Sequence, residues 1–287
     1  MPTSDPFIRS YLDRIAYDGP LDVSLATLRA LNVAHAASIP FENISSFIGI
    51  PPRLDLPSLQ AKLIDGGRGG YCFEQNTLLC AVLTRLGFCV TPLAGRVVWM
   101  QPPDGPPTPR SHMLLRVETE VGPHIVDVGF GGHIMTSPLR LASGESQKSL
   151  TGSQRIVEGV GQYAVEVELP RGWFPTYRFT LDPHLPVDFE PLNWFTATHE
   201  SSLFVANLLL ERVTPEVRFS LFNEVFTIRR KDQPPETRRI GDQADFTQAL
   251  TDAFNLPETL PFGTMFERLA KGVDGPTNHS KTNGEQP

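Results

Sequence analysis

A chain of 287 residues, 40% of them hydrophobic, is long enough to bury the core of one large domain or of two to three smaller ones. Its formal net charge of −7 and the lack of any Lys/Arg-rich run argue against nucleic acid as the main partner. No apolar run approaches the roughly 20 residues that span a bilayer, and the N-terminus lacks a signal-peptide pattern, so we expect a cytoplasmic protein without a membrane partner.

The first 87 residues have mainly helical patterns. Four segments have apolar residues at helical spacing, with capping or helix-breaking residues at their ends. They begin near Asp5, Leu25, Asp55 and Cys72. Residues 39–44, between the second and third segments, are expected to be extended, because the residue before Pro40 is pushed out of the helical region. Gly87 is a helix C-terminal signal that ends the fourth segment.

The patterns change to strands after Gly87. Strands are expected over residues 88–98, 112–117, 125–128, 163–169 and 173–181. Residues 101–110 contain five prolines and are expected to form a loop. A turn that contains Gly122-Pro123 is expected to join the second and third of these strands. Short strands at this spacing favour a small sheet or barrel.

The last third of the chain mixes helices and strands. Residues 183–191, rich in Pro and Asp/Glu, are expected to be a linker or a domain boundary. Beyond it we expect a short helix over residues 193–201, strands over 208–213, 217–221 and 225–230, and an amphipathic helix over 245–254. We therefore predict an α+β chain with a helical domain over residues 1–87, a β-barrel domain over 88–190, an α/β domain over 191–271 and a disordered tail over 272–287.

The stretch from Arg68 to Asn76 combines glycines, a cysteine and the start of a helix. A free cysteine thiol has a pKa near 8.5. A helix N-terminus presents unpaired N–H groups and the positive end of the helix dipole, and both favour the thiolate. Cys72 is therefore a candidate nucleophile, which a histidine oriented by a carboxylate would activate further.

The predicted strands contain candidates for the histidine and the carboxylate. Of the seven histidines, His112, His124 and His133 lie near these strands, and His112 opens its strand directly after the Pro-rich loop. Asp127 is one carboxylate in an otherwise apolar strand, where a buried charge needs a partner. A hairpin would bring His112 and Asp127 together. If His112 paired directly with Asp127, the turn would be centred near residues 119–120, slightly before the expected turn at Gly122-Pro123. A longer, asymmetric loop between the two strands would allow both.

Each of these residues also has a plain structural interpretation. A cysteine at a helix start is more often a small buried hydrophobe, and a histidine at a strand start is usually a satisfied polar residue. The glycines beside Arg68 can simply form a turn before the helix. They are not a phosphate loop, because G-x-x-x-x-G-K-[ST] is absent, and Gly129–Gly132 does not have the spacing of a dinucleotide fingerprint.

Four separated motifs, taken together and in order, resemble the arylamine N-acetyltransferases. They are Ile39–Asn43 (Ile-Pro-Phe-Glu-Asn), Arg68–Glu74 (Arg-Gly-Gly-Tyr-Cys-Phe-Glu), Ser111-His112 and Asp127–Gly131 (Asp-Val-Gly-Phe-Gly). The resemblance covers about residues 5–270. It implies a cysteine-protease-like Cys72–His112–Asp127 triad, and a helical first domain, a β-barrel second domain and an α/β third domain that acts as a lid. The Pro-rich loop and the tail lie outside the recognisable motifs.

The resemblance implies an acyltransferase that moves an acetyl group from acetyl-CoA to the nitrogen of arylamines or arylhydrazines by a ping-pong route, as in xenobiotic metabolism. Cys72 would be acetylated, and His112 would activate it and later take a proton from the amine. Asp127 would hold His112 in the correct tautomer. Glu42 and Arg68 are implied to pair and lock the nucleophile loop; the alternative is two unrelated surface charges.

The expected substrate contacts follow from motif position. An arylamine offers a flat ring with little charge, which favours an aromatic pocket. The candidates for this pocket are Phe41, Tyr71, Phe130 and Phe204, each of which can also be ordinary core packing. For CoA, Gly131 and Gly132 would let the pyrophosphate approach the backbone, and Ser111 would add a hydroxyl contact.

Other functions fit the same residues. A thiol hydrolase or transglutaminase-like acyltransferase would use the same triad, and a scaffold or binding protein would keep these residues as core. Preferential alkylation of Cys72 over Cys80 and Cys89 would count against the scaffold. The odd number of cysteines and the lack of C-x-x-C predict reduced thiols and no metal site. The sequence leaves open the physiological acceptor amine, the acyl chain length and the oligomeric state.

Overall fold

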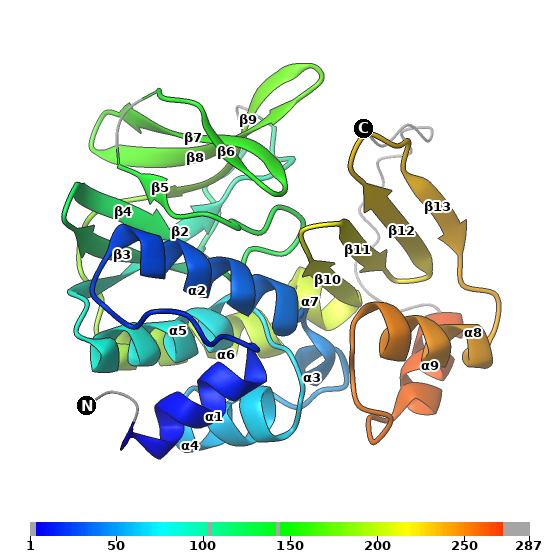
Figure 1. The fold of residues 1–287 in the computed structure, drawn as a ribbon. Coiled ribbons are helices and arrows are strands. Elements are labelled where there is room, and N and C mark those ends of the chain that lie inside the picture. Colours follow the sequence, from blue (N-terminus) through cyan, green and yellow to red (C-terminus); the bar gives the residue numbers. More distant parts are fainter. Residues whose placement is uncertain (1–3, 103–104, 142–143, 272–287) are drawn as a thin grey trace.

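The computed structural model describes residues 4–102, 105–141 and 144–271, and Figure 1 shows helices and two antiparallel sheets in these ranges. The helices before the first long strand are α1 (Pro6–Arg14), α2 (Leu25–Ser38), α3 (Ile44–Phe47), α4 (Leu56–Leu59), the π-helix η2 (Gln60–Asp65) and α5 (Cys72–Leu86). The later ones are α6 (Pro186–Thr198), α7 (Leu203–Ala206), α8 (Gln243–Gln248), the π-helix η3 (Ala249–Ala253) and α9 (Phe262–Ala270).

The four expected N-terminal helices are confirmed, and local chemistry sets their ends. Asp5 caps α1 by accepting a hydrogen bond from the Phe7 N–H at 2.9 Å, as Asp commonly does at this position. Gly87 ends α5 with a φ of 99°, a left-handed conformation that glycine adopts without strain. The expected third helix differs, because α4 continues into the π-helix η2.

A curved sheet of eight strands, close to a barrel, occupies the middle of the chain. Its strands, in spatial order, are β5 (Leu139–Arg140), β4 (Gly122–Val126), β3 (Arg110–Thr119), β2 (Val90–Val97), β9 (Gly172–Phe179), β8 (Gln162–Leu169), β7 (Gly152–Gly159) and β6 (Gln147–Ser149). The expected turn at Gly122-Pro123 is wrong: Thr119 pairs with Gly122, so the turn consists of two residues and Gly122-Pro123 opens β4. Strands β5, β6 and β7 were not expected.

A second sheet joins the beginning and the end of the chain. Its five strands, in spatial order, are β1 (Phe41–Glu42), β10 (Leu209–Val213), β11 (Val217–Phe222), β12 (Val225–Arg230) and β13 (Glu236–Arg239). Phe41 pairs with Glu211, so the motif before the nucleophile is hydrogen-bonded to a strand about 170 residues later. Figure 1 shows β10 next to α2 and α7, at the centre of the molecule.

The expected linker over residues 183–191 is wrong, because α6 begins at Pro186. Proline fits the first turn of a helix, and the Leu185 N–H donates to the Asp188 carboxylate at 2.7 Å. The predicted domain boundary between residues 190 and 191 therefore falls inside α6. The division into three domains and the lid role of the third remain predictions, and the predicted tail over residues 272–287 lies outside the described residues.

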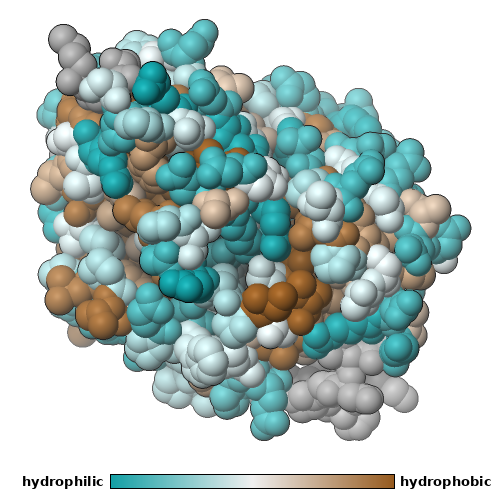
Figure 2. Space-filling view, turned by 90° about the horizontal axis from the view of Figure 1, so that it is seen from below, coloured by the Kyte–Doolittle hydropathy of each residue, from teal (hydrophilic) through white to brown (hydrophobic). Residues whose placement is uncertain are grey.

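Three apolar cores hold the elements together. One lies between the N-terminal helices and the curved sheet, a second between α8, η3, α9 and the five-stranded sheet, and a third inside the curved sheet. On the face drawn in Figure 2, apolar residues form separate patches among polar ones. Among the described residues, no helix is both long and apolar enough to cross a membrane.

Candidate active site

Cys72 is the first residue of α5 and is 2% exposed. Its sulfur lies 3.7 Å from the backbone carbonyl oxygen of Ser111, on the strand that also carries His112. The Glu74 carboxylate accepts a hydrogen bond from the Tyr71 N–H at 3.2 Å and so fixes the entry of the chain into the helix. The cysteine therefore stands at a helix N-terminus, where N–H groups lack acceptors within the helix.

His112 and Asp127 form a buried pair beside this cysteine. The distance from His112 Nε2 to Asp127 Oδ2 is 2.6 Å, and the two side chains are 2% and 0% exposed. The direct register considered from the sequence does not occur: the last paired residues of the hairpin are Leu115 and Val126, so His112 and Asp127 both lie beyond the ladder. After Val126 the chain lies against α5, where the Val128 N–H donates to Asn76, and the two side chains meet there.

The other oxygen of Asp127 is also fully used. Asp127 Oδ1 accepts hydrogen bonds from Asn76 Nδ2 and from the Gly129 N–H, each at 2.9 Å. Asn76 lies one turn after Cys72 on α5, and its own oxygen accepts from the Val128 N–H at 3.2 Å. Gly129 lies so close to the helix that a Cβ on it would come within 2.4 Å of Cys72 Cα. The carboxylate loop is therefore attached directly to the helix that carries the cysteine.

This environment changes the pKa values of both partners. Burial favours the neutral form of His112, but Asp127 and, after it, Cys72 outweigh burial and raise the pKa of His112 to about 10. Burial likewise favours the neutral form of Asp127, but His112, Asn76 and the Gly129 N–H hold its pKa below the usual range. Both shifts favour the imidazolium–carboxylate form of the pair.

We expect the stabilising effect of His112 to disappear at alkaline pH. Its folded-state pKa of about 10 lies above the ordinary value of 6.5, so its contribution is complete below pH 6.5 and is lost as the pH rises through 10. Urea unfolding of the wild type and of His112→Gln between pH 6.5 and 10 should give a difference in free energy of unfolding that shrinks with pH. His199→Gln, at an exposed position, is the control. If the difference in free energy of unfolding between the wild type and His112→Gln stayed constant or grew as the pH rose, the raised pKa of His112 would be contradicted.

A second charged cluster supports the loop before Cys72. Arg68 Nη2 lies 2.7 Å from Glu42 Oε1, so the pair that the resemblance implied is present. Lys62, from the π-helix η2, lies 2.7 Å from Glu74 Oε1 and 3.6 Å from Glu42 Oε1. Glu42 and Glu74 are buried, so these cations reduce the cost of placing two carboxylates inside the protein. Lys62 was not predicted, and a lysine in a short helix gives no sequence signal for this role.

A cavity of about 870 Å³ opens onto Cys72. Residues from both sheets and from α6 and α7 line it. The predicted site residues among its lining are Phe41, Cys72, Ser111, His112, Phe130, Gly131, Gly132 and Phe204. The cavity therefore brings together the candidate nucleophile, the histidine and most of the residues expected to contact substrates.

Four predicted site residues lie outside the lining. Asp127, Glu42 and Arg68 stand behind it, in the supporting positions described above. Tyr71 does not face the cavity either: it is 1% exposed, and its hydroxyl donates to the side-chain oxygen of Asn193 on α6. Tyr71 thus contacts the cavity wall from behind, through its ring-to-ring contact with Phe204 at 5.6 Å.

The polar groups of Gly132 already have partners. Its N–H donates to the Glu211 carboxylate, and its carbonyl oxygen accepts from Arg218. Arg229, on β12, also lines the cavity and donates to the Ser220 hydroxyl at 3.0 Å. Within the described ranges no carboxylate lies within ion-pair distance of Arg229. The sequence pattern did not predict this cation in the cavity, where the Glu211 carboxylate acts on Arg229 only from beyond ion-pair distance.

Two further residues near the pair were missed. Asn76 has a detectable signal, because it is a polar residue on the buried face of an otherwise apolar helix. Tyr177, on β9, gave none: its ring centroid lies 4.5 Å from that of His112, and this contact depends on how the sheet curves.

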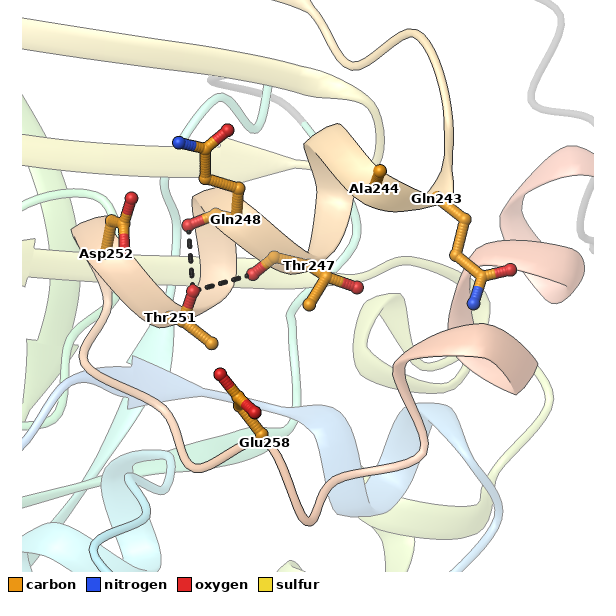
Figure 3. Close-up of a pocket in the computed structure, with 7 residues that line it drawn as sticks. All are labelled: Gln243, Ala244, Thr247, Gln248, Thr251, Asp252 and Glu258. Atoms are coloured by element: carbon orange, nitrogen blue, oxygen red, sulfur yellow. Dashed lines mark hydrogen bonds between the residues drawn. The ribbon is translucent and has the colours of Figure 1, made fainter.

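A separate hollow on α8 and η3, drawn in Figure 3, offers no comparable chemistry. It is lined by Gln243, Ala244, Thr247, Gln248, Thr251, Asp252 and Glu258. The Thr251 hydroxyl contacts carbonyl oxygens of its own helix, at 3.0 Å from Thr247 and 3.1 Å from Gln248. The hollow contains no cysteine or histidine. In the parts of the chain that the structure describes, no group of three or more His, Cys, Asp or Glu side chains could hold a metal ion.

A cysteine at a helix start beside a histidine–aspartate pair is an arrangement found in enzymes with a thiol nucleophile. The comparisons narrow this class: a family model for N-acetyltransferases matches residues 24–260. An arylamine N-acetyltransferase from Mycolicibacterium smegmatis is 38% identical over 249 residues, which cover 86% of this chain and 90% of the relative. The chain belongs to the arylamine N-acetyltransferase family and is an acyltransferase.

Solved structures agree with this assignment. The arylamine N-acetyltransferase of Mycobacterium marinum has a TM-score of 0.88 at 35% identity, with 93% of this chain and 99% of that chain covered. The structure of the same enzyme in complex with CoA has a TM-score of 0.87 at 35% identity and covers 92% and 98% of the two chains. The expected mixed fold is therefore confirmed.

Proposed function

We propose that this protein transfers the acetyl group of acetyl-CoA to the nitrogen of arylamines or arylhydrazines, through an acetylated Cys72. The observation that carries the proposal is the position of Cys72 at a helix N-terminus, inside a cavity and beside a histidine whose Nε2 is 2.6 Å from a buried carboxylate. The names of the relatives and the CoA complex of a structural neighbour support the donor and the acceptor class.

In the first half of the reaction, the Cys72 thiolate attacks the carbonyl carbon of the thioester. The bond to the CoA sulfur breaks, and the departing thiolate takes a proton from the His112 imidazolium. Asp127 keeps the Nε2–H of the ring engaged, so that the other ring nitrogen serves the reacting atoms. One thioester replaces another, so this step needs little driving force.

In the second half, the amine nitrogen attacks the acetyl carbon on Cys72. The amine loses its proton to the neutral His112 ring, and Cys72 leaves as the thiolate that begins the next cycle. The aromatic rings of Phe41, Phe130 and Phe204 in the cavity lining support a flat acceptor, because aromatic rings pack favourably in offset or edge-to-face contacts. A charged acceptor would bind less well against these rings, because burial of an unpaired charge costs free energy.

We propose donor contacts that differ in part from those that the resemblance implies. A side chain at Gly131 is excluded, because its Cβ would lie 2.5 Å from the Phe41 ring. The Gly132 N–H is engaged by Glu211, which argues against a contact between this N–H and the CoA pyrophosphate. Arg229 is better suited to meet a phosphate, since its guanidinium lines the cavity and donates to no carboxylate within the described residues. Ser111 remains a candidate for a hydroxyl contact.

The proposal is tested by separating the two half-reactions. With acetyl-CoA alone, we expect a burst of about one CoA per chain and one added acetyl group on the peptide that contains Cys72. Addition of an arylamine should then remove the acetyl group and produce the N-acetylated amine. Steady CoA release by hydrolysis, without an effect of the amine, would instead favour the thiol hydrolase.

A further inference from the structure

We propose that Asn43 is a positioning residue for the acceptor site, which holds Phe204 in place and so makes the enzyme select amines that have an aromatic ring. Asn43 ends the sequence motif Ile39–Asn43, but it has no place in the triad, in the charged cluster or in the cavity lining. The inference rests on the proposed function, because it assigns a specificity to the second half-reaction.

The Asn43 side chain connects three points of a distant segment. It is 2% exposed, and its Nδ2 donates to the carbonyl oxygens of Phe204 at 2.8 Å and of Asn207 at 2.7 Å. Its Oδ1 accepts from the Leu209 N–H at 2.7 Å. Both donor hydrogens and one acceptor position of the amide are therefore used, all on a segment more than 160 residues away.

The segment that carries Phe204 depends on such external contacts. Helix α7 has only four residues, too few to be stable by itself. The carbonyl groups at its C-terminal end have no N–H donor within the helix and need partners from elsewhere. Asn43 supplies donors for two of these carbonyls. Arg268, from α9, supplies another for the Val205 carbonyl oxygen at 2.9 Å. The position of α7 is thus set from outside, and Asn43 follows Glu42, which pairs with Arg68 of the nucleophile loop.

The position of α7 decides where the Phe204 ring stands. The ring lines the cavity, with its centroid 5.9 Å from that of Phe41 and 5.6 Å from that of Tyr71. Phe41 and Tyr71 are fixed by β1 and by the start of α5. Without the Asn43 hydrogen bonds the third ring is free to move relative to the other two, so the aromatic wall loses its geometry while Cys72, His112 and Asp127 keep all of their contacts.

The experiment compares three rates: acetylation of Cys72 by acetyl-CoA, and deacetylation of the S-acetyl enzyme by 4-methoxyaniline and by hydrazine, which has no ring. For Asn43→Ala we expect the rate constant with 4-methoxyaniline to fall about tenfold, the value of an aromatic contact, and the other two to change by less than about twofold. A merely structural role would lower all three rates by a similar factor, and that result, or no change at all, would overturn the proposal.

Two further variants sharpen the test. Phe204→Leu should give the same selective loss, and the double variant should lose little more, because both changes remove one contact. Additive losses in the double variant would count against action through Phe204. Asn32→Ala is the matched control, since its buried amide likewise donates to a distant carbonyl oxygen, that of Met135 at 2.7 Å, and lies outside the cavity lining. If Asn43→Ala does not fold, Asn43→Ser, which keeps one donor, carries the same comparison.

Failure of the proposed function has a different signature. If the wild-type protein gives no acetylated Cys72 with acetyl-CoA, the reaction itself is wrong. If Cys72 is acetylated normally and Asn43→Ala treats 4-methoxyaniline and hydrazine alike, only the role of Asn43 is wrong.

Discussion

Replacement of Cys72 by alanine is expected to lower acetyl transfer by about 10³-fold or more, because the reaction loses the atom that carries the acetyl group. The side chain is small and almost fully buried, so the change removes only the sulfur and leaves the start of α5 in place. The measurement is CoA release in the presence of an arylamine, together with the intact mass of the protein after incubation with acetyl-CoA. No acetylated form should appear.

The chain provides its own control for this variant. Cys80 lies on the same helix two turns later, and Cys89 is exposed beyond its end. Cys80→Ala and Cys89→Ala should both keep the acetylated intermediate and the rate. Transfer by Cys72→Ala at a rate near that of the wild type would remove Cys72 from the mechanism.

Asp127→Asn is expected to lower the rate on the order of 10³-fold, although the side chain keeps its size. The aspartate accepts from His112 on one oxygen and from Asn76 and the Gly129 N–H on the other. An asparagine has a single carbonyl oxygen, so its amide group must face either the donors on the Gly129 side or the histidine ring. In the second orientation the asparagine N–H donates to His112 Nε2. The ring proton of neutral His112 then lies on Nδ1, the nitrogen that must accept a proton at the reacting atoms.

The loss in Asp127→Asn should appear in both half-reactions, because His112 serves both. Rapid-mixing measurement of Cys72 acetylation and of amine-dependent deacetylation separates them. Asp188→Asn, at the capped start of α6, is a control with the same chemical change outside the cavity. If Asp127→Asn slowed only one half-reaction, the assumed role of the aspartate in holding the tautomer would be wrong.

Local patterns predicted most of the helices and strands but not their exceptions. The helices with capping residues and an apolar stripe are found where expected, as at Asp5 and Gly87. Strand β13 consists of exposed residues only, so it has no apolar pattern to detect. The Pro- and Asp/Glu-rich residues 183–191 predict a linker, but α6 begins among them, because the first turn of a helix accepts proline.

The sequence by itself determined the candidate nucleophile and its two partners: local features made Cys72, His112 and Asp127 candidates, and the resemblance of four motifs to a known family favoured them over a plain structural role. Only the tertiary structure decided how they meet. His112 and Asp127 approach beyond the end of their shared ladder, and Asn76 and Gly129 attach the carboxylate to the helix of Cys72. Lys62, Arg229 and Asn43 act across long sequence separations, and such contacts depend on sheet register and helix packing, which no local pattern specifies.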